Sequence, residues 1–434
     1  MSPLLTRIDL RGETGPLAGL LPAPTAGGSG PVDAVAAILA DVAARGDEAL
    51  RELTARFDGV ELGELRVPPA EVAAAADAVE PRLRRALEAA AANIEAYHRT
   101  QLHDSPGRRV GGSSVRELRR PVERAGLYVP GGRAPLASSV LMTAVPARVA
   151  GVAGLAVVTP PGPDGRVHPA ILAAAAVAGV DEVYRVGGAQ AVAALAYGTE
   201  SIPAVDVIVG PGNVYVATAE RLVAQEGAVG VPSAFTGPSE VAVVADGSIP
   251  PEWAAIDLVV QAEHGPDGLA YLVTWSEEVA AAVSAAVEEI TASSPRREEV
   301  TSTLERGGYA VIVDGPQQAV EVANVIAAEH LELQVADPEA LVAGVRCAGA
   351  IFTGRWAPAS VGDYAAGPSH VLPTARSARF GSALRVDDFC RYIHVVDLDR
   401  PALAELAPHV VALAEVEGLA AHADSVRMRM EAPA

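Results

Sequence analysis

Residues 155–210 read LAVVTPPGPDGRVHPAILAAAAVAGVDEVYRVGGAQAVAALAYGTESIPAVDVIVG, and this stretch decides the fold. Apolar runs of strand length, such as LAVV (155–158) and VDVIVG (205–210), alternate with longer runs of helical length, HPAILAAAAVAG (168–179) and AQAVAALAYG (189–198). Each strand-like run ends in glycine or proline. Strands that alternate with helices in this way form a parallel sheet whose faces the helices cover.

The alternation extends in both directions. It begins at GLYVP (126–130), and a second series starts at VAVVAD (241–246). In the second series we expect the strands AYLVTW (270–275), YAVIVDG (309–315) and AGAIFTG (348–354), and helices at 251–264, 277–290, 316–330 and 338–347. Helical periodicity also marks residues 32–103, whereas residues 1–30 read as a loop and the Arg-rich stretch Pro106 to Arg120 as a hairpin or linker.

These patterns predict an α/β fold with two incomplete Rossmann-like parallel-sheet domains, a helical N-terminal region and a C-terminal appendage. The predicted boundaries are an N-terminal extension at 1–30, a helical region at 31–121 that contributes to the first α/β domain, the first α/β domain at 122–238, the second at 239–380 and a tail at 381–434.

Composition excludes several classes of function. Half of the 434 residues are hydrophobic, which argues against a disordered chain, and the net charge of −21 argues against nucleic acid as a partner. All 33 basic residues are arginine. Schiff-base chemistry, a Walker A lysine and a Ser-Lys dyad are therefore excluded, because arginine does not give up its proton. Cys347 and Cys390 are too few for a disulfide framework or a Cys-rich zinc site.

Neither a targeting nor a membrane segment is visible in the sequence. The first 15 residues, MSPLLTRIDLRGETG, include Asp9 and lack the apolar core of a signal peptide. The longest uncharged stretch, Val149 to Pro163, is too short and too rich in Gly and Pro to cross a bilayer. We therefore expect a cytoplasmic protein with no membrane partner.

Two glycine-rich strand exits are candidates for binding a phosphate group. VGGAQ (186–190) and VGPGN (209–213) each follow a strand and precede a helix, whereas no GxGxxG occurs at such a junction. Backbone N–H groups at a helix start can hold a pyrophosphate. The alternative is that these glycines only make turns.

Four of the nine histidines stand in unusual surroundings. His264 lies three residues after Gln261 in QAEH, so both share one helix face. His370 follows Asp363 in the Gly/Pro-containing loop GDYAAGPSH, His330 follows Glu329, and His422 follows Glu417 near the end of the chain. Oxygen and imidazole ligands suit zinc. The alternative is a set of polar caps, because these groups lie far apart in sequence.

Nine segments give the chain a recognisable family pattern. They are GLYVPGG, VGGAQAVAALAYGT, VGPGNVYV, GPSEV, QAEH, AAEHLEL, GAIFTG, VGDYAAGPSHVLPT and the terminal EGLAAHADSVRMR. In content, order and spacing they resemble the histidinol dehydrogenase family over nearly the full length. The resemblance implies a zinc-dependent, NAD-linked oxidation of L-histidinol to L-histidine through the aldehyde, at the end of histidine biosynthesis.

The resemblance also implies the roles of individual residues. It identifies 122–238 as the NAD-binding domain, 239–380 as the zinc and catalytic domain, and 381–434 as a tail swapped between the two subunits of a homodimer. One Zn2+ per subunit is expected on Gln261, His264, Asp363 and His422, with Glu329 and His330 as catalytic residues. The family's substrate contacts match Ser239, His370, Tyr364 and Glu417 together with Gln261, His264, His330, Asp363 and His422, and its NAD+ contacts match Tyr128, Gln190 and Asn213.

From the residues themselves, neutral His330 has a pKa suited to accepting the hydroxyl proton of the substrate, and the Glu329 carboxylate could deprotonate a water that attacks the aldehyde.

Three positions depart from the family pattern, and two alternatives stay open. Glu220 stands where a lysine is usual, Pro232 where an acid is common, and Gly265 follows the zinc helix in place of aspartate. One alternative is a paralogue that oxidises another polar alcohol or diol. The other is an inactive homologue that binds or scaffolds, although every expected ligand and base is present.

Overall fold

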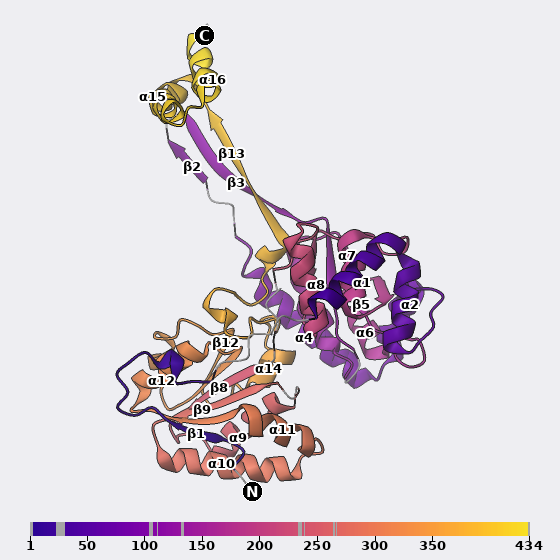
Figure 1. Ribbon diagram of the computed structural model, residues 1–434, viewed down its shortest axis with the longest axis vertical. Coiled ribbons are helices and arrows are strands. Elements are labelled where there is room, and N and C mark those ends of the chain that lie inside the picture. The colour runs from indigo at the N-terminus through magenta and orange to yellow at the C-terminus, as the bar shows by residue number, and fades with distance from the viewer. Residues whose placement is uncertain are drawn as a thin grey trace.

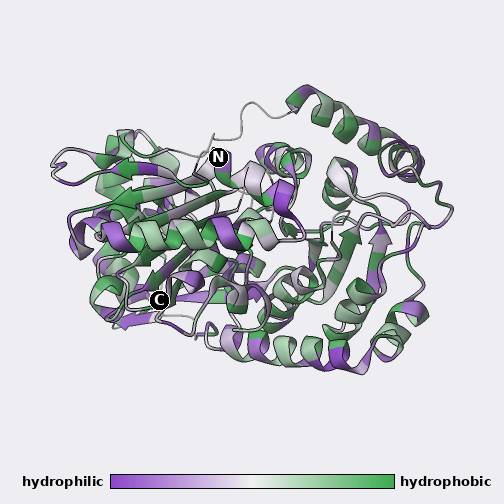
Figure 2. Ribbon diagram, turned by 90° about the horizontal axis from the view of Figure 1, so that it is seen from below, coloured by the Kyte–Doolittle hydropathy of each residue, from purple (hydrophilic) through white to green (hydrophobic). Residues whose placement is uncertain are grey.

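The computed structural model describes residues 3–22, 31–103, 107–110, 112–131, 134–232, 237, 239–263, 265 and 267–432. Two parallel sheets, each flanked by helices, form two α/β units, and an antiparallel arm extends from them to the helices α15 and α16 (Figure 1). Figure 2 shows hydrophobic colouring along many strands and mixed colouring on the helices around them. The α/β prediction with two parallel sheets is confirmed.

The first sheet has four parallel strands in the order β6-β5-β4-β7. The strands are β4 (Arg124–Tyr128), β5 (Gly154–Thr159), β6 (Glu182–Arg185) and β7 (Val207–Val209). The helices α5 (Ala137–Ala150), α6 (Pro169–Val177), α7 (Gly188–Tyr197) and α8 (Val214–Gln225) alternate with them as predicted. The strand order changes direction between β4 and β7, which is where ligands bind in sheets of this kind.

The N-terminal helices cover the faces of the first sheet. They are α1 (Val32–Arg45), α2 (Asp47–Asp58), α3 (Pro69–Ala78) and α4 (Pro81–Arg99). Helix α1 packs on α7 and α8, whereas α3 packs on α6 and α4 on α5. Two hydrophobic clusters result, one on each face, and both contain fully buried residues such as Leu127 and Ile208.

The second sheet has six parallel strands in the order β1-β10-β9-β8-β11-β12. They are β1 (Thr6–Asp9), β8 (Glu240–Ala245), β9 (Leu269–Thr274), β10 (Gly308–Ile312), β11 (His330–Gln334) and β12 (Ala350–Thr353). The accompanying helices are α9 (Pro251–Ala262), α10 (Glu277–Ser293), α11 (Arg297–Gly307), α12 (Pro316–Ile326), α13 (Glu339–Val342) and α14 (Ala359–Tyr364). Short 3-10 turns occur at Leu17–Gly19, Ser377–Arg379 and Val386–Phe389.

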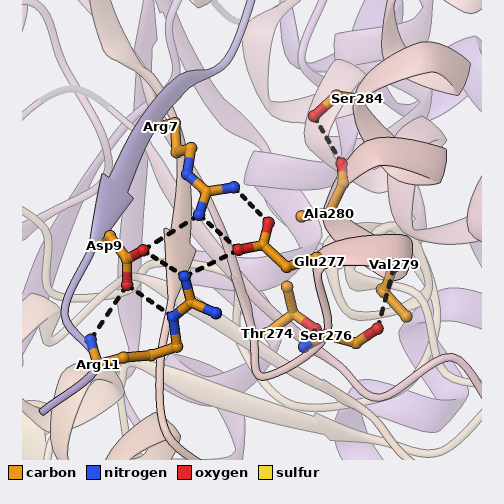
Figure 3. A network of polar contacts seen from close by, with 9 residues as sticks. All are labelled: Arg7, Asp9, Arg11, Thr274, Ser276, Glu277, Val279, Ala280 and Ser284. Carbon is orange, nitrogen blue, oxygen red and sulfur yellow. Dashed lines mark hydrogen bonds and ion pairs between the residues drawn. The ribbon is translucent and has the colours of Figure 1, made fainter.

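The N-terminal segment is not the loop that we expected throughout, because β1 pairs with β10 at the edge of the second sheet. Figure 3 shows how polar contacts hold it there: Arg7 on β1, and Arg11 just beyond it, face the carboxylate of Glu277 at the start of α10. Asp9 binds both guanidinium groups. Four residues are too few for periodicity to identify a strand whose partner lies about 300 residues away in the chain.

The predicted helix at 316–330 is too long, and a strand within it was missed. Helix α12 ends at Ile326, Ala327 takes a left-handed conformation (φ 52°), and HLELQ then forms the buried strand β11. Its polar side chains His330, Glu332 and Gln334 hide the apolar signature of a buried strand. The helix predicted at 338–347 is likewise only Glu339–Val342. Helix α11 was also not predicted.

The arm consists of β2 (Gly107–Val110), β3 (Ser113–Pro121) and β13 (Cys390–Leu398), followed by α15 (Arg400–Val416) and α16 (Ala420–Glu431). Strands β2 and β3 make the hairpin that the Arg-rich sequence predicted, and β13 pairs antiparallel with the whole length of β3. Helices α15 and α16 pack on each other at the far end of the arm. Among the described residues, no helix combines the length and the hydropathy that crossing a membrane requires.

Candidate active site between the two sheets

A cavity of about 1340 Å³ opens at the carboxyl edge of the first sheet. The three residues expected to contact NAD+, Tyr128, Gln190 and Asn213, all line it. The cavity lies at the change of direction in the strand order, between the ends of β4 and β7. The structure therefore brings together three residues from different parts of the stretch between positions 128 and 213.

Local backbone geometry orients these side chains. Tyr128 ends β4, and its hydroxyl accepts a hydrogen bond from the Gly188 N–H at 3.0 Å, which links β4 to the start of α7. Asn213 caps α8, because its Oδ1 accepts from Tyr215 N and Val216 N at 2.9 and 3.2 Å. Gly188 has φ +65°, and a Cβ there would overlap the Gln190 side chain at 2.7 Å. The glycine-rich strand exits thus face the cavity through the starts of two helices.

The predicted catalytic residues lie at the amino edge of the second sheet. Glu329 precedes β11 and His330 begins it, and both are buried, with exposed fractions of 8% and 4%. His330 Nε2 is 3.3 Å from Asp363 Oδ1, and His330 Nδ1 is 3.7 Å from Glu329 Oε2. The Glu329 carboxylate also accepts a hydrogen bond from Glu240 N at 3.2 Å and contacts Ser239.

Charge and burial perturb the pKa values of Glu329 and His330. Burial acts to lower the pKa of His330, but the Glu329 charge and the hydrogen bond to Asp363 outweigh it and raise the pKa to about 9. Burial raises the pKa of Glu329 and so makes it a stronger base than an exposed carboxylate. Two carboxylates that face the same imidazole thus favour its protonated form in this arrangement, whereas the sequence analysis considered His330 as a neutral base.

Gln261 reaches the same edge from the end of α9. It is buried, with an exposed fraction of 3%. A Cβ on Gly268 would lie 3.4 Å from the Ser239 carbonyl oxygen and 3.5 Å from that of Gln261, so these backbones approach closely. His264 lies outside the described residues. Tyr364 ends α14 and is 63% exposed.

His370 links the two α/β units through contacts of its two ring nitrogens. Its Nδ1 is 2.9 Å from the Asp363 carbonyl oxygen in the second unit, and its Nε2 is 3.2 Å from Ser139 Oγ on α5 of the first. Asn93 on α4 adds a second link through the Ala365 carbonyl at 2.8 Å. The loop before α5 lines the cavity of the first unit. These hydrogen bonds join the loop after Asp363 to helices α4 and α5 of the unit that holds the cavity.

The last two predicted site residues lie away from the edge of the second sheet that carries Glu329 and His330. Glu417 follows α15 and His422 lies in α16, both exposed, at the far end of the arm (Figure 1). Among the described residues, no group of three or more His, Cys, Asp or Glu side chains is placed to hold a metal ion. The chemistry of the expected donors, two imidazoles, a carboxylate and an amide oxygen, nevertheless fits zinc.

Two groups next to the catalytic pair were missed by the sequence analysis. Glu240 is 1% exposed, and burial together with the charge of Glu329 raises its pKa to about 8. Ser139 lies on the apolar helix α5 and contacts His370. A charged residue at the start of a buried strand and a buried serine in an apolar helix were the only signals available.

Comparison with known proteins assigns the chain to a family. The family model described as histidinol dehydrogenase matches residues 27–430. Histidinol dehydrogenases from Synechococcus sp. and Rhizobium meliloti are 48% and 49% identical over 397 and 399 residues, covering 91% of each chain. The crystal structure of histidinol dehydrogenase from Elizabethkingia anophelis superposes with a TM-score of 0.94 at 32% identity and covers 99% of both chains.

Proposed function

The chain belongs to the histidinol dehydrogenase family of oxidoreductases, and from this premise we propose that it oxidises L-histidinol to L-histidine through L-histidinaldehyde, with two NAD+ used in turn. One observation carries the proposal. The buried residues Glu329 and His330 lie against Asp363, whose carbonyl oxygen contacts His370. His370 in turn contacts helix α5 of the unit that holds the cavity lined by Tyr128 and Asn213.

The first oxidation requires a base beside a hydride acceptor. His330 would take the hydroxyl proton while hydride leaves the same carbon for the nicotinamide. For this the imidazole must be neutral. Asp363 contributes twice to the raised pKa of His330, by its hydrogen bond and by its charge, so engaging Asp363 elsewhere would bring the imidazole closer to neutrality.

The second oxidation needs water. Glu329 would accept a proton as the water oxygen adds to the aldehyde, and the hydrate would lose its second hydride to a fresh NAD+. The raised pKa of the buried Glu329 suits this role, since a carboxylate with a higher pKa is a better base. An aldehyde kept between the two units during the exchange of cofactor is protected from loss.

Zinc would be held by Gln261, His264, Asp363 and His422. It would bind the amine and the imidazole of the substrate and so hold the substrate in position. Ser239 and His370 border the same edge and would contact the substrate. Tyr364 is open to an incoming ligand. Glu417 would pair with the substrate ammonium.

A second copy of the chain would complete the site. Glu417 follows α15 and His422 lies in α16. Figure 1 shows both helices at the end of the arm, away from α9 and α14, which carry Gln261 and Asp363. The end of the arm exposes apolar side chains, among them Leu413, Val416 and Met428, at 66%, 88% and 70%. Such a surface needs a partner. We infer a homodimer with two sites, each completed in trans.

The test is NADH formation by the purified protein with L-histidinol, counted per molecule of substrate. Two NADH per histidinol, with histidine as product, is the expected result. A panel of polar alcohols and diols run beside it distinguishes a paralogue. No NADH from histidinol with zinc-loaded, dimeric protein would overturn the proposal. A single NADH per substrate would overturn the second oxidation.

A further inference from the structure

A buried polar network lies directly behind the catalytic edge. On β11, side chains alternate between the two faces, so His330, Glu332 and Gln334 share one face. Glu332, Gln334 and Asp257 of α9 are 1%, 5% and 9% exposed. The Gln334 amide nitrogen donates to Asp257 Oδ2 and to Glu332 Oε2, each at 2.7 Å. We call these three residues the acid–amide network.

The network also reaches a third element. The Ala359 N–H, the first of α14, donates to Glu332 Oε1 at 2.9 Å. Asp363 follows Ala359 by four residues on the same helix, and Gln261 follows Asp257 by four residues on α9. Residues four apart lie on one face of a helix. Each element that the network joins therefore carries one residue of the proposed site.

Burying the acid–amide network costs free energy of folding, so its presence needs an explanation. Two carboxyl groups and an amide are buried in the interior, where burial opposes the charged form of an acid. Burial and the nearby Asp257 charge raise the pKa of Glu332 to about 8. Well-packed apolar residues would stabilise a sheet–helix interface at least as well. Apolar packing, however, does not fix the angle and position of α14 as directed hydrogen bonds do.

We propose that Asp257, Glu332 and Gln334 are positioning residues that fix α9, β11 and α14 relative to one another, and thereby the spacing of Gln261, His330 and Asp363. As far as it concerns zinc, this inference rests on the proposed function. Glu332 is the centre of the network, because its two oxygens serve α14 and Gln334 separately. None of the three needs to contact substrate or metal to act in this way.

The test compares Glu332→Leu with Glu332→Gln. Leucine removes the acceptor of the Ala359 N–H, whereas glutamine keeps one oxygen for it, so the hydrogen bond to α14 survives only in the second variant. Hydrogen exchange of residues 359–364 is measured by mass spectrometry in metal-free protein. Zinc affinity is measured by competition with a chromophoric chelator, and KM and kcat with histidinol.

We expect Glu332→Leu to exchange faster in α14 and to bind zinc about 10- to 100-fold more weakly, as supporting residues of metal sites do. The KM should rise by a similar factor, and Glu332→Gln should restore both within about threefold. Unchanged exchange and zinc affinity in Glu332→Leu would overturn the inference, as would Glu332→Gln behaving like Glu332→Leu.

If Glu332→Leu does not fold, the pair Asp257→Leu and Asp257→Asn gives the same comparison, because asparagine keeps an acceptor for Gln334. The exchange measurement needs neither zinc nor histidinol. A wild-type protein that binds no zinc would refute the zinc site, while protection of α14 that depends on Glu332 would still support the network.

Discussion

Replacing Glu220 by glutamine should stabilise the protein at neutral pH and leave it little changed in weak acid. Glu220 lies on α8 with no exposed surface, and neither of its carboxyl oxygens has a hydrogen-bond partner among the described residues. Burial raises its pKa well above 4.5. The carboxyl group must therefore take up a proton, or bury a charge, whenever the chain folds at neutral pH.

The sign and size of the effect follow from proton linkage. Because the folded state holds the proton more tightly than the unfolded state, stability falls as the pH rises from about 4.5 to the folded pKa. Each pH unit within that window costs about 1.4 kcal/mol. Between pH 5.5 and 7.0 the wild type should therefore lose stability that Glu220→Gln retains, and the upper limit of this loss, set by 1.5 pH units of linkage, is about 2 kcal/mol.

Urea unfolding followed by circular dichroism at both pH values measures this difference. Glu64→Gln is the matched control, since Glu64 is exposed in the same unit, and it should change stability by less than about 0.5 kcal/mol at either pH. A Glu220→Gln gain that is the same at pH 5.5 and 7.0, or no gain at all, would refute the reasoning.

Three further predictions concern the proposed reaction. Asp363→Ala, or removal of metal from the wild type, should abolish turnover while the circular dichroism spectrum persists, and activity that survives a strong chelator would contradict the zinc site. Glu329→Gln should slow single-turnover oxidation of histidinal more than that of histidinol, and equal losses would remove the role of Glu329 as the base for water. Mixing His422→Ala with His330→Ala subunits should restore up to about half the wild-type activity per heterodimer, because one site then carries both lesions and the other neither. Heterodimers without activity would show that each tail serves its own subunit.

The sequence predicted the first sheet well because its elements are uninterrupted apolar runs. Strand β5 and helix α6 are apolar along almost their whole lengths, so their periods are visible in a short window. In the second sheet β11 was missed because its buried face carries His330, Glu332 and Gln334. Functional groups occupy positions that an ordinary strand fills with apolar residues, and they conceal the strand for that reason.

The identities of the candidate residues came from short motifs, whereas their arrangement required the structure. Ser139 and His370 are 231 positions apart, so their spacing in the sequence does not predict that they touch. The same holds for Asp363 and His330. The raised pKa of His330 could not be predicted from the sequence for the same reason, because it arises from two carboxylates that the fold places against the imidazole.

The edge strand β1 has a consequence for how the protein is made. Residues 6–9 pair with 309–312, so the first strand to leave the ribosome cannot complete the second sheet until its partner has been synthesised. At about 5–20 residues per second, the delay is roughly 15–60 s. The first sheet, whose strands lie within 124–209, has no such delay. The order of synthesis therefore favours a first α/β unit that folds early and a second unit whose sheet is completed last, when β1 docks beside β10.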